Sequence, residues 1–406
     1  MVRAVQIAGG AFSDRQFRLF FIGIFCAVQA IWIQRVTLGW LAWERTGQAS
    51  VVGLVAGLSL VPSLLTGPFF GVLVDRVNIK HAALVTNGSM AAWLAVLALS
   101  AGQVGAVGLA IAALGIGVIS AAHHPVRMSL APRLVAPEMV QHVVSVTALN
   151  FNLARLVAPV IAGWIIATAG GGVALWIAAA CYLPMLSILP VLTPRALPPR
   201  PARPFFSDLL EGLRFAAARP LIRNALLITL ALSVIVRGAL ELLPVLADGG
   251  YGRGAAGLGL LTAAAGGGAL VAAVFKTLGV GHAGASISVS VWALAIVGQS
   301  AVVLMGVGPT WPMAMSSAAL AGAASTWVGI SLQAAIQTDL PDGYRGRVMS
   351  LWIVVGLGSV SLGAFAIGGL AQILGIGAAL VCAGLAGLTM LALVAFRMRS
   401  TAKAPN

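Results

Sequence analysis

Long apolar runs, separated by short charged or Gly/Pro-rich segments, make up most of this sequence. A membrane-spanning helix needs about 20 apolar residues, and the runs reach that length without the alternating polarity of a barrel strand. We therefore expect an all-α membrane protein with twelve transmembrane helices. The expected helices cover residues 17–43, 50–73, 81–101, 105–130, 139–168, 172–192, 220–246, 255–279, 284–305, 309–338, 344–374 and 376–397.

The composition excludes an ordinary soluble protein, because 60% of the 406 residues are hydrophobic and only 8% are charged. Soluble domains usually carry about 25% charged residues. The net charge of +14 could suggest nucleic-acid binding, but its placement follows the positive-inside rule. With a cytoplasmic N-terminus, 19 Lys and Arg fall on the cytoplasmic side, two on the other side and three within spans. This count predicts a multi-pass protein of the cell inner or plasma membrane, with both termini in the cytoplasm and no nucleic-acid partner.

The one long polar stretch, residues 193–219, divides the chain into two halves of six spans each. It contains five prolines and then Asp208, Glu211 and Arg214, which predicts a stiff cytoplasmic linker followed by a short surface helix over 207–218. The expected domains are a six-helix bundle over 1–192, the linker over 193–219 and a second six-helix bundle over 220–406.

An internal repeat supports this division. Residues 135–138 (VAPE) align with 339–342 (DLPD) at an offset of 204, and 169–175 (AGGGVAL) align with 374–380 (LGIGAAL) at an offset of 205. Duplicated six-span halves are typical of secondary transporters. The sequence thus favours two pseudo-symmetric bundles.

Ionisable residues inside the spans point to a polar path. Each costs about 2.5–3.5 kcal/mol in the hydrocarbon layer on insertion scales, so it should face protein or water. Spans 3, 6, 9 and 12 have no Asp, Glu, Lys or Arg in their interiors, and we expect them to face lipid. The other spans should enclose a substrate cavity, for which the polar and aromatic candidates are Gln29, Trp32, Arg35, Asn152, Arg155, Thr229, Ser233, Thr326 and Gln333.

Span 7 has the clearest pattern, because Thr229, Ser233, Arg237 and Glu241 recur every four residues and form one stripe. Pro244 should bend the helix beyond them. Glu241 is the only carboxylate well inside any span, which makes it the candidate proton carrier, with Arg237 one turn away tuning its proton affinity. The alternative is that the two residues only neutralise each other.

The two other arginines within spans also leave alternatives open. The guanidinium of Arg155, near the midpoint of span 5, would favour an anionic or carbonyl-rich ligand, or it could make a structural contact with another helix. Arg35 could line the cavity together with Gln29 and Trp32, or it could extend to the membrane interface.

Other chemistries find no support in the sequence. Cys26, Cys181 and Cys382 are scattered in apolar runs and fit no metal or disulfide pattern, and no phosphate-binding P-loop motif is present. His123 and His124 could shuttle protons, but their place at the end of span 4 favours a packing role. We expect no enzyme activity, no metal and no cofactor.

The segment 71–80, GVLVDRVNIK, resembles the loop 2–3 signature of the major facilitator superfamily, G-x-L-x-D-R-x-G-R-K, with departures at Asn78 and Ile79. The resemblance implies that Asp75 contacts the start of span 11 and acts as a latch that closes the cytoplasmic side. The residues assigned to gating are Gly71, Asp75, Arg76, Lys80, Arg127, Pro159, Arg345 and Arg347.

Further segments are similar to the enterobactin-exporter-like branch of this superfamily, also called transmembrane secretion effectors. They are residues 17–20 (FRLF), 32–36 (WIQRV), 125–127 (PVR), 154–159 (ARLVAP), 211–214 (EGLR), 242–246 (LLPVL) and 337–350 (QTDLPDGYRGRVMS). Membership implies twelve helices in two bundles around a central site that opens to each side in turn. It also implies export of small organic molecules against proton entry.

Two departures from the branch affect proton coupling. The Gly-Asp pair common before the span 1 tryptophan is Ala30-Ile31 here, and the span 5 antiporter motif G-P-x-x-G-G is Ala158-Pro159-Val160-Ile161-Ala162-Gly163. Coupling therefore depends on Glu241. We expect a monomeric secondary transporter whose partners are a small, partly apolar substrate, protons and the bilayer. An uncoupled or importing permease is the alternative, and a transporter-like receptor is a more distant one.

Overall fold

The computed structural model of the chain describes residues 12, 14–195, 205–280, 286–308 and 310–403. These residues are almost entirely helical and contain no strand. Twelve helices in the described part are long and apolar enough to cross a membrane, which confirms the expected number. Residues 196–204, which carry four of the five linker prolines, lie outside the described part.

The first bundle is formed by the spans of the N-terminal half. They are α2 (Arg15–Thr46), α3 (Ala49–Arg76), α4 (Ile79–Ser100), α5 (Ala106–Leu130), α6 (Val140–Ala169) and a sixth span divided into α7 (Gly171–Ala180) and α8 (Leu183–Ile188). Short 3₁₀ turns flank them: η1 (Ala131–Arg133), η2 (Pro137–Met139) and η3 (Leu189–Val191).

The second bundle begins after α9 (Phe205–Ala218), which is the surface helix expected over 207–218. Its seventh span is composite, with α10 (Pro220–Ala231), the π-helical segment η4 (Leu232–Arg237), α11 (Gly238–Glu241) and the π-helical segment η5 (Val245–Gly250). The remaining elements are α12 (Gly254–Thr277), α13 (Val289–Val307), α14 (Trp311–Asp339), α15 (Asp342–Ile353), the π-helical segment η6 (Val354–Gly358), α16 (Ser359–Leu374) and α17 (Ile376–Lys403). Span 9 starts five residues later than the expected 284, and residues 281–285 lie outside the described part.

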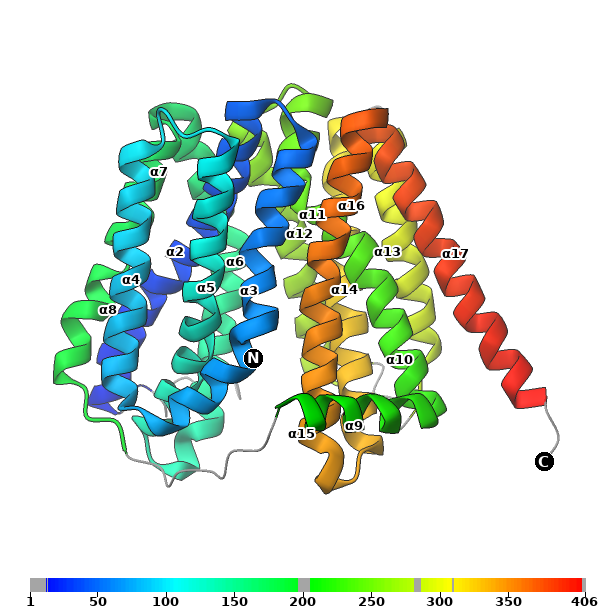
Figure 1. Cartoon of the computed structure of the whole chain (residues 1–406), viewed down its shortest axis with the longest axis horizontal. Helices are drawn as coiled ribbons and strands as arrows, with labels where there is room; N and C mark the ends of the chain where they lie inside the picture. Colours follow the sequence, from blue (N-terminus) through cyan, green and yellow to red (C-terminus); the bar gives the residue numbers. More distant parts are fainter. Residues whose placement is uncertain (1–11, 13, 196–204, 281–285, 309, 404–406) are drawn as a thin grey trace.

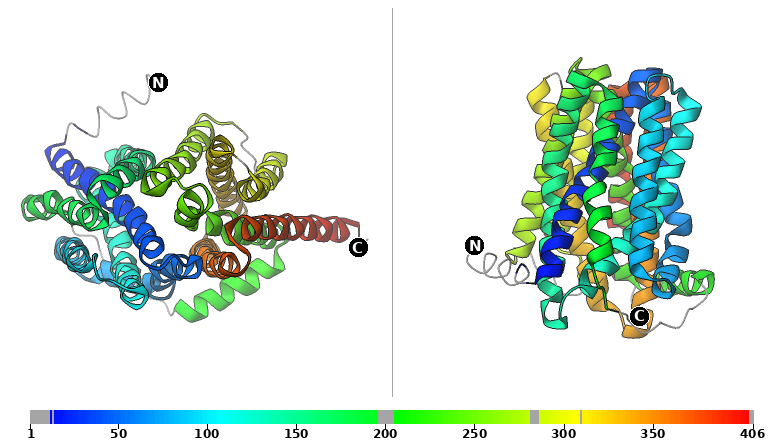
Figure 2. Two further views of the ribbon diagram at one scale, coloured as in Figure 1. Left: turned by 90° about the horizontal axis from the view of Figure 1, so that it is seen from above. Right: turned by 90° about the vertical axis from the view of Figure 1, so that its left-hand side faces the viewer.

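The two bundles stand side by side, and α9 crosses one end of the second bundle (Figure 1). We call the end that carries α9, the start of α2 and the end of α17 the linker side, and the opposite end the far side. The third helix of each triplet lies at the periphery, as α17 does in Figure 2. These helices carry exposed large apolar side chains, such as Leu99, Val289, Leu393 and Phe396, which suit contact with lipid.

Local sequence explains several helix ends. Asp14 caps α2, since its carboxylate accepts hydrogen bonds from the backbone N–H groups of Gln16 (2.7 Å) and Phe17 (3.1 Å). Gly170 and Gly375, with φ of 86° and 80°, make the turns between spans 5 and 6 and between spans 11 and 12. A positive φ favours glycine. These two glycines occupy equivalent positions of the repeat, so the structure places the aligned segments at equivalent turns.

On the far side the bundles cross twice at glycines. A Cβ on Gly53 of α3 would overlap the carbonyl oxygen of Ala364 on α16, beside Gly368. A Cβ on Gly163 of α6 would lie 2.6 Å from the carbonyl oxygen of Ala255 on α12, beside Gly259. Only glycine permits such close backbone approach.

The two crossings are related by the internal repeat. Gly53 precedes Gly259 by 206 residues and Gly163 precedes Gly368 by 205, close to the offsets of the aligned segments. Polar contacts between the bundles also lie toward this side, including the hydrogen bond from Trp43 Nε1 to Asp248 Oδ2 at 2.9 Å. In the described part of the chain, the bundles are therefore closed against each other on the far side.

Candidate functional site

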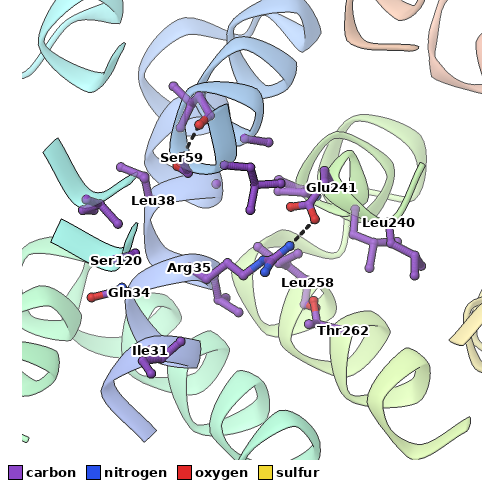
Figure 3. A pocket seen from close by; sticks show the side chains of 18 of the residues that line it. Ile31, Gln34, Arg35, Leu38, Ser59, Ser120, Leu240, Glu241, Leu258 and Thr262 are labelled. Carbon is purple, nitrogen blue, oxygen red and sulfur yellow. Dashed lines mark hydrogen bonds and ion pairs between the residues drawn. The ribbon is translucent and has the colours of Figure 1, made fainter. Parts of the chain in front are cut away.

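Two cavities lie along the inner helices. The first, which we call the far-side cavity, has a volume of about 230 Å³ and lies between the bundles (Figure 3). Its lining is largely apolar, with a few hydroxyl groups and one ion pair. The polar and charged side chains that line it are Gln34, Arg35, Ser59, Ser63, Ser120, Glu241 and Thr262.

The second cavity, which we call the linker-side cavity, has a volume of about 260 Å³ and a much more polar lining. It lies among α14, the composite spans 7 and 11, and Arg155 of α6. Its polar and aromatic side chains belong to Arg155, Thr229, Ser233, Arg237, Ser325, Thr326, Gln333 and Trp352. Among the residues that line it there are two arginines and no carboxylate.

An ion pair between the bundles forms part of the far-side cavity. Arg35 Nη2 on α2 donates to Glu241 Oε1 on α11, as the dashed line in Figure 3 shows. The side chain of Arg35 remains 45% exposed and that of Glu241 13% exposed. Because Arg35 reaches across to the other bundle while it stays accessible, it lines the cavity rather than extending to the membrane interface.

The partner of Glu241 differs from the one expected from sequence spacing. Arg237 is one turn away, but the described contacts of Glu241 join it to Arg35. The π-helical segment η4 ends at Arg237 and widens the helix there. As a result, Thr229, Ser233 and Arg237 line the linker-side cavity, whereas Glu241 lines the far-side cavity.

Arg237 connects the irregular parts of two spans. Its Nη1 lies 3.4 Å from the carbonyl oxygen of Gly356, which belongs to the π-helical segment η6 of span 11. A π-helical segment inside an α-helix frequently marks a functional site. The helix irregularity therefore falls at the cavity and begins before Pro244, the residue expected to bend span 7.

Trp32 holds two of the arginines in place. The guanidinium carbons of Arg35 and Arg155 lie 5.7 Å and 5.8 Å from the centroid of its ring, and the Phe151 ring lies 5.6 Å away. These distances allow cation–π attraction. Trp32 Nε1 is buried and lacks a hydrogen-bond partner in the described part. Trp32 thus supports the cavities from behind rather than lining either of them.

The candidate cavity residues divide into three groups. Arg35 and Glu241 line the far-side cavity, while Arg155, Thr229, Ser233, Arg237, Thr326 and Gln333 line the linker-side cavity. Gln29 and Trp32 line neither, and the Gln29 Oε1 atom is buried without a hydrogen-bond partner in the described part of the chain. Asn152 also lines neither cavity, because its amide donates to the Ala148 carbonyl oxygen of its own helix at 2.9 Å.

Sequence reasoning missed several lining residues. The far-side cavity is also lined by Ser59 and Ser63 on α3, Ser120 on α5 and Gln34 on α2. The buried Oε1 atom of Gln34 has no hydrogen-bond partner among the described residues. Ser59 and Ser63 are four residues apart, so the same spacing test that singled out span 7 could have found them. Gln34 lies next to Arg35 in the sequence, and its contribution depends on packing that the sequence pattern does not reveal.

The gating candidates have mixed surroundings. Lys80 donates to the Pro190 carbonyl oxygen of its own bundle, and the guanidinium of Arg127 lies 5.2 Å from the Phe151 ring. The Pro159 carbonyl oxygen lies at the α6–α12 crossing. Arg347 forms an ion pair with Glu211 of α9 at 2.6 Å. Gly71 lies within α3, the side chains of Asp75, Arg76 and Arg345 lie outside the described part, and the latch stays a prediction.

No group of three or more His, Cys, Asp or Glu side chains converges among the described residues. His123 is buried, with Nε2 at 3.4 Å from Asn87 Oδ1 and its ring edge-on to Tyr182 at 6.1 Å. These contacts fit a packing role within the first bundle.

Comparison with known proteins agrees with this arrangement. The sequence profile of the family described as "Transmembrane secretion effector" matches residues 8–405. The enterobactin exporter EntS of Escherichia coli O1:K1 / APEC is 30% identical over 336 residues, which cover 81% of this chain and 76% of that protein.

Solved transporter structures share the fold. The nucleoside transporter NupG superposes with a TM-score of 0.75 at 11% identity, covering 96% of this chain and 99% of NupG. A bacterial homolog of the human lysosomal transporter Spinster gives a TM-score of 0.67 at 16% identity and covers 95% of each chain. At these identities the likeness establishes the fold alone, whereas the family match covers nearly the whole chain. The chain therefore belongs to the transmembrane secretion effector family of the major facilitator superfamily, a family of membrane transporters.

Proposed function

We propose that this transporter exports a small, partly apolar organic molecule by alternating access and that inward proton movement through Glu241 drives the export. The observation that carries the proposal is the ion pair between Arg35 and Glu241, which joins the bundles beside a cavity. Glu241 is the last residue of the segment Pro220–Glu241 of the seventh span, before the π-helical segment η5, and it lines the far-side cavity.

The ion pair suits the logic of antiport. In an antiporter, proton flow stays coupled to substrate flow only if the protein with neither proton nor substrate bound does not change conformation. With Glu241 ionised, the pair with Arg35 holds the bundles together on the far side. A proton on Glu241 removes the negative charge and weakens this attraction. The protonated protein can then change between its two conformations, so a proton taken up while the far side is open can be released on the linker side.

The direction follows from orientation, which we propose from the positive-inside count. On that count the linker side faces the cytoplasm and the closed far side faces outward. Moving one proton across 100 mV releases about 2.3 kcal/mol. One proton per cycle is then enough for more than a tenfold substrate gradient.

Transport assays in proteoliposomes test the coupling. Enterobactin, which the relatives export by name, is the first substrate to try. An imposed pH gradient should drive its uptake into inside-out vesicles by the wild-type protein and fail to do so in Glu241→Gln. Glu44→Gln is the matched control, because Glu44 accepts a hydrogen bond from Trp40 of its own helix and lines neither cavity. Equal gradient-driven uptake by Glu241→Gln and wild type would remove Glu241 from the mechanism, and gradient-independent flux in both would favour an uncoupled permease.

Cysteine labelling tests the orientation. In a variant with Cys26, Cys181 and Cys382 replaced by alanine, a membrane-impermeant maleimide added to intact cells should label Gln103→Cys on the far side. Thr193→Cys on the linker side should be labelled only after permeabilisation. The reverse pattern would invert the topology and the proposed direction.

A further inference from the structure

The linker-side cavity holds unbalanced positive charge. Together the two cavities contain the arginines Arg35, Arg155 and Arg237 and one carboxylate, that of Glu241. Arg35 pairs with Glu241. Arginine keeps its charge at any physiological pH. Two positive charges therefore face the linker-side cavity, whose lining residues include no carboxylate, and Glu241 attracts both only from outside that lining.

The other polar groups of this cavity are mostly hydrogen-bond donors or hydroxyls. Thr229, Ser233, Ser325 and Thr326 supply hydroxyl groups, and Gln333 supplies an amide. The hydroxyls of Thr229 and Ser325 donate to carbonyl oxygens of their own helices and can still accept hydrogen bonds. Arg155 lies against the Trp32 ring and Arg237 donates to the Gly356 carbonyl oxygen, which leaves most of their N–H groups available. An arginine fork binds carboxylate-like groups through paired, charge-assisted hydrogen bonds.

Two glycines leave room for a ligand between these groups. Gly329 on α14 and Gly356 on η6 both line the cavity, and a Cβ on either would meet nothing within 4 Å. Most glycines in the spans instead permit close helix contact, as Gly53 and Gly163 do. The open space above Gly329 and Gly356 is therefore part of the cavity itself.

We propose that the linker-side cavity is the binding site for the anionic group of an organic anion, held between Arg155 and Arg237. The apolar part of this organic anion would extend toward the far-side cavity. The inference rests on the proposed transport function and names the substrate class. The two cavities adjoin through span 7, where Arg237 faces one and Glu241 the other, and through Trp32, which touches Arg35 and Arg155.

The same geometry explains how substrate could release the far-side ion pair. A bound anion near Trp32 adds negative charge beside Arg35 and competes with Glu241 for it. Substrate and proton would then each weaken the Arg35–Glu241 pair, which is the behaviour that exchange of one for the other requires.

Equilibrium binding tests the site without any gradient. The probes are carboxylate, carboxamide and methylammonium versions of phenyl, naphthyl and biphenyl scaffolds, added to the purified full-length protein. Carboxylates should raise the melting temperature and bind in calorimetry, with weaker binding by the amides and none by the ammonium compounds. Arg155→Gln and Arg237→Gln should each weaken the best carboxylate at least tenfold. Arg253→Gln is the control, because Arg253 also lies over a tryptophan, Trp311 at 5.6 Å, but lines neither cavity.

A second pair of variants tests the same site without altering charge. Gly329→Leu fills the open space and should abolish carboxylate binding, whereas Gly369→Leu on α16, also without neighbours within 4 Å, should leave it unchanged. Three results would each overturn the proposal. They are no stabilisation by any carboxylate, equal binding of carboxylates and ammonium compounds, and unchanged carboxylate affinity in both arginine variants and in Gly329→Leu. Carboxylate binding together with equal gradient-driven uptake by Glu241→Gln and wild type would leave the site standing and reject only proton coupling.

Discussion

Arg35 of α2 and Glu241 of α11 are 206 residues apart in the sequence and form an ion pair that joins the two bundles. The pair lies on the far-side half of the molecule, where both glycine crossings also occur. An attraction at this position stabilises the arrangement in which the far side is closed.

Exchanging the two charged residues tests whether far-side closure depends on the attraction between opposite charges or on the particular side chain at each position. Arg35→Gln and Glu241→Gln should each weaken far-side closure by about 1–2 kcal/mol, less than a fully buried pair because Arg35 is 45% exposed. The exchange Arg35→Glu with Glu241→Arg should recover part of this closure. Distances between spin labels on the far-side ends of α3 and α16 report the closed population. Closure that stays unchanged in both single variants would show that the pair contributes nothing to it.

The glycine crossings should be more sensitive than the ion pair. A Cβ on Gly53 overlaps the Ala364 carbonyl oxygen and a Cβ on Gly163 lies 2.6 Å from that of Ala255. Backbone atoms cannot rotate away, so Gly53→Ala and Gly163→Ala should push α3 from α16 and α6 from α12. We expect far-side labels to move apart and transport to fall at least tenfold. Gly369→Ala serves as the control because nothing lies within 4 Å of its Cβ position. Wild-type label distances in both crossing variants would contradict this account of closure.

The twelve spans could be predicted because the signal for each is local. A run of about 20 apolar residues forms a helix in a bilayer whatever it packs against. The repeat was also visible, since the turns at Gly170 and Gly375 need glycine and keep their spacing. The linker helix could be located from its charges and the prolines before it.

The pairing inside the site could not be predicted in the same way. A spacing of four places Arg237 and Glu241 on one face of a regular α-helix, but η4 interrupts that regularity. The π-helical segments carry no periodic pattern, since they arise where neighbouring helices pack. The partner of Glu241 comes from the other half of the chain, and only the tertiary fold brings Arg35 of α2 to it.

The surface helix α9 is attached to the second bundle by aromatic and charged contacts. Phe215 stacks on Tyr344 of α15 with ring centroids 4.0 Å apart, next to the ion pair between Glu211 and Arg347. An aromatic pair contributes about 0.5–1.5 kcal/mol beyond its buried area. Phe215→Ala should therefore raise amide hydrogen exchange in α9 by about twofold to tenfold, while exchange in α10 stays the same. Leu213→Ala, at a 50% exposed residue of α9, is the control. Equal exchange in Phe215→Ala and wild type would mean that α9 is held by other contacts.

Trp32 should act through its ring and not through its N–H group. The ring lies under the guanidinium groups of Arg35 and Arg155, and each such contact contributes about 0.5–2 kcal/mol. Its Nε1 atom is buried without a hydrogen-bond partner among the described residues, which costs free energy rather than adding stability. Trp32→Phe keeps an aromatic face and removes that N–H, so its melting temperature should stay within a few degrees of wild type. Trp32→Leu removes the face, frees both arginines, and should lower the melting temperature and any carboxylate affinity together. Thermal unfolding and calorimetry on the two variants measure both quantities. A Phe variant as impaired as the Leu variant would assign the role to the indole N–H, with a ligand or water as its missing acceptor.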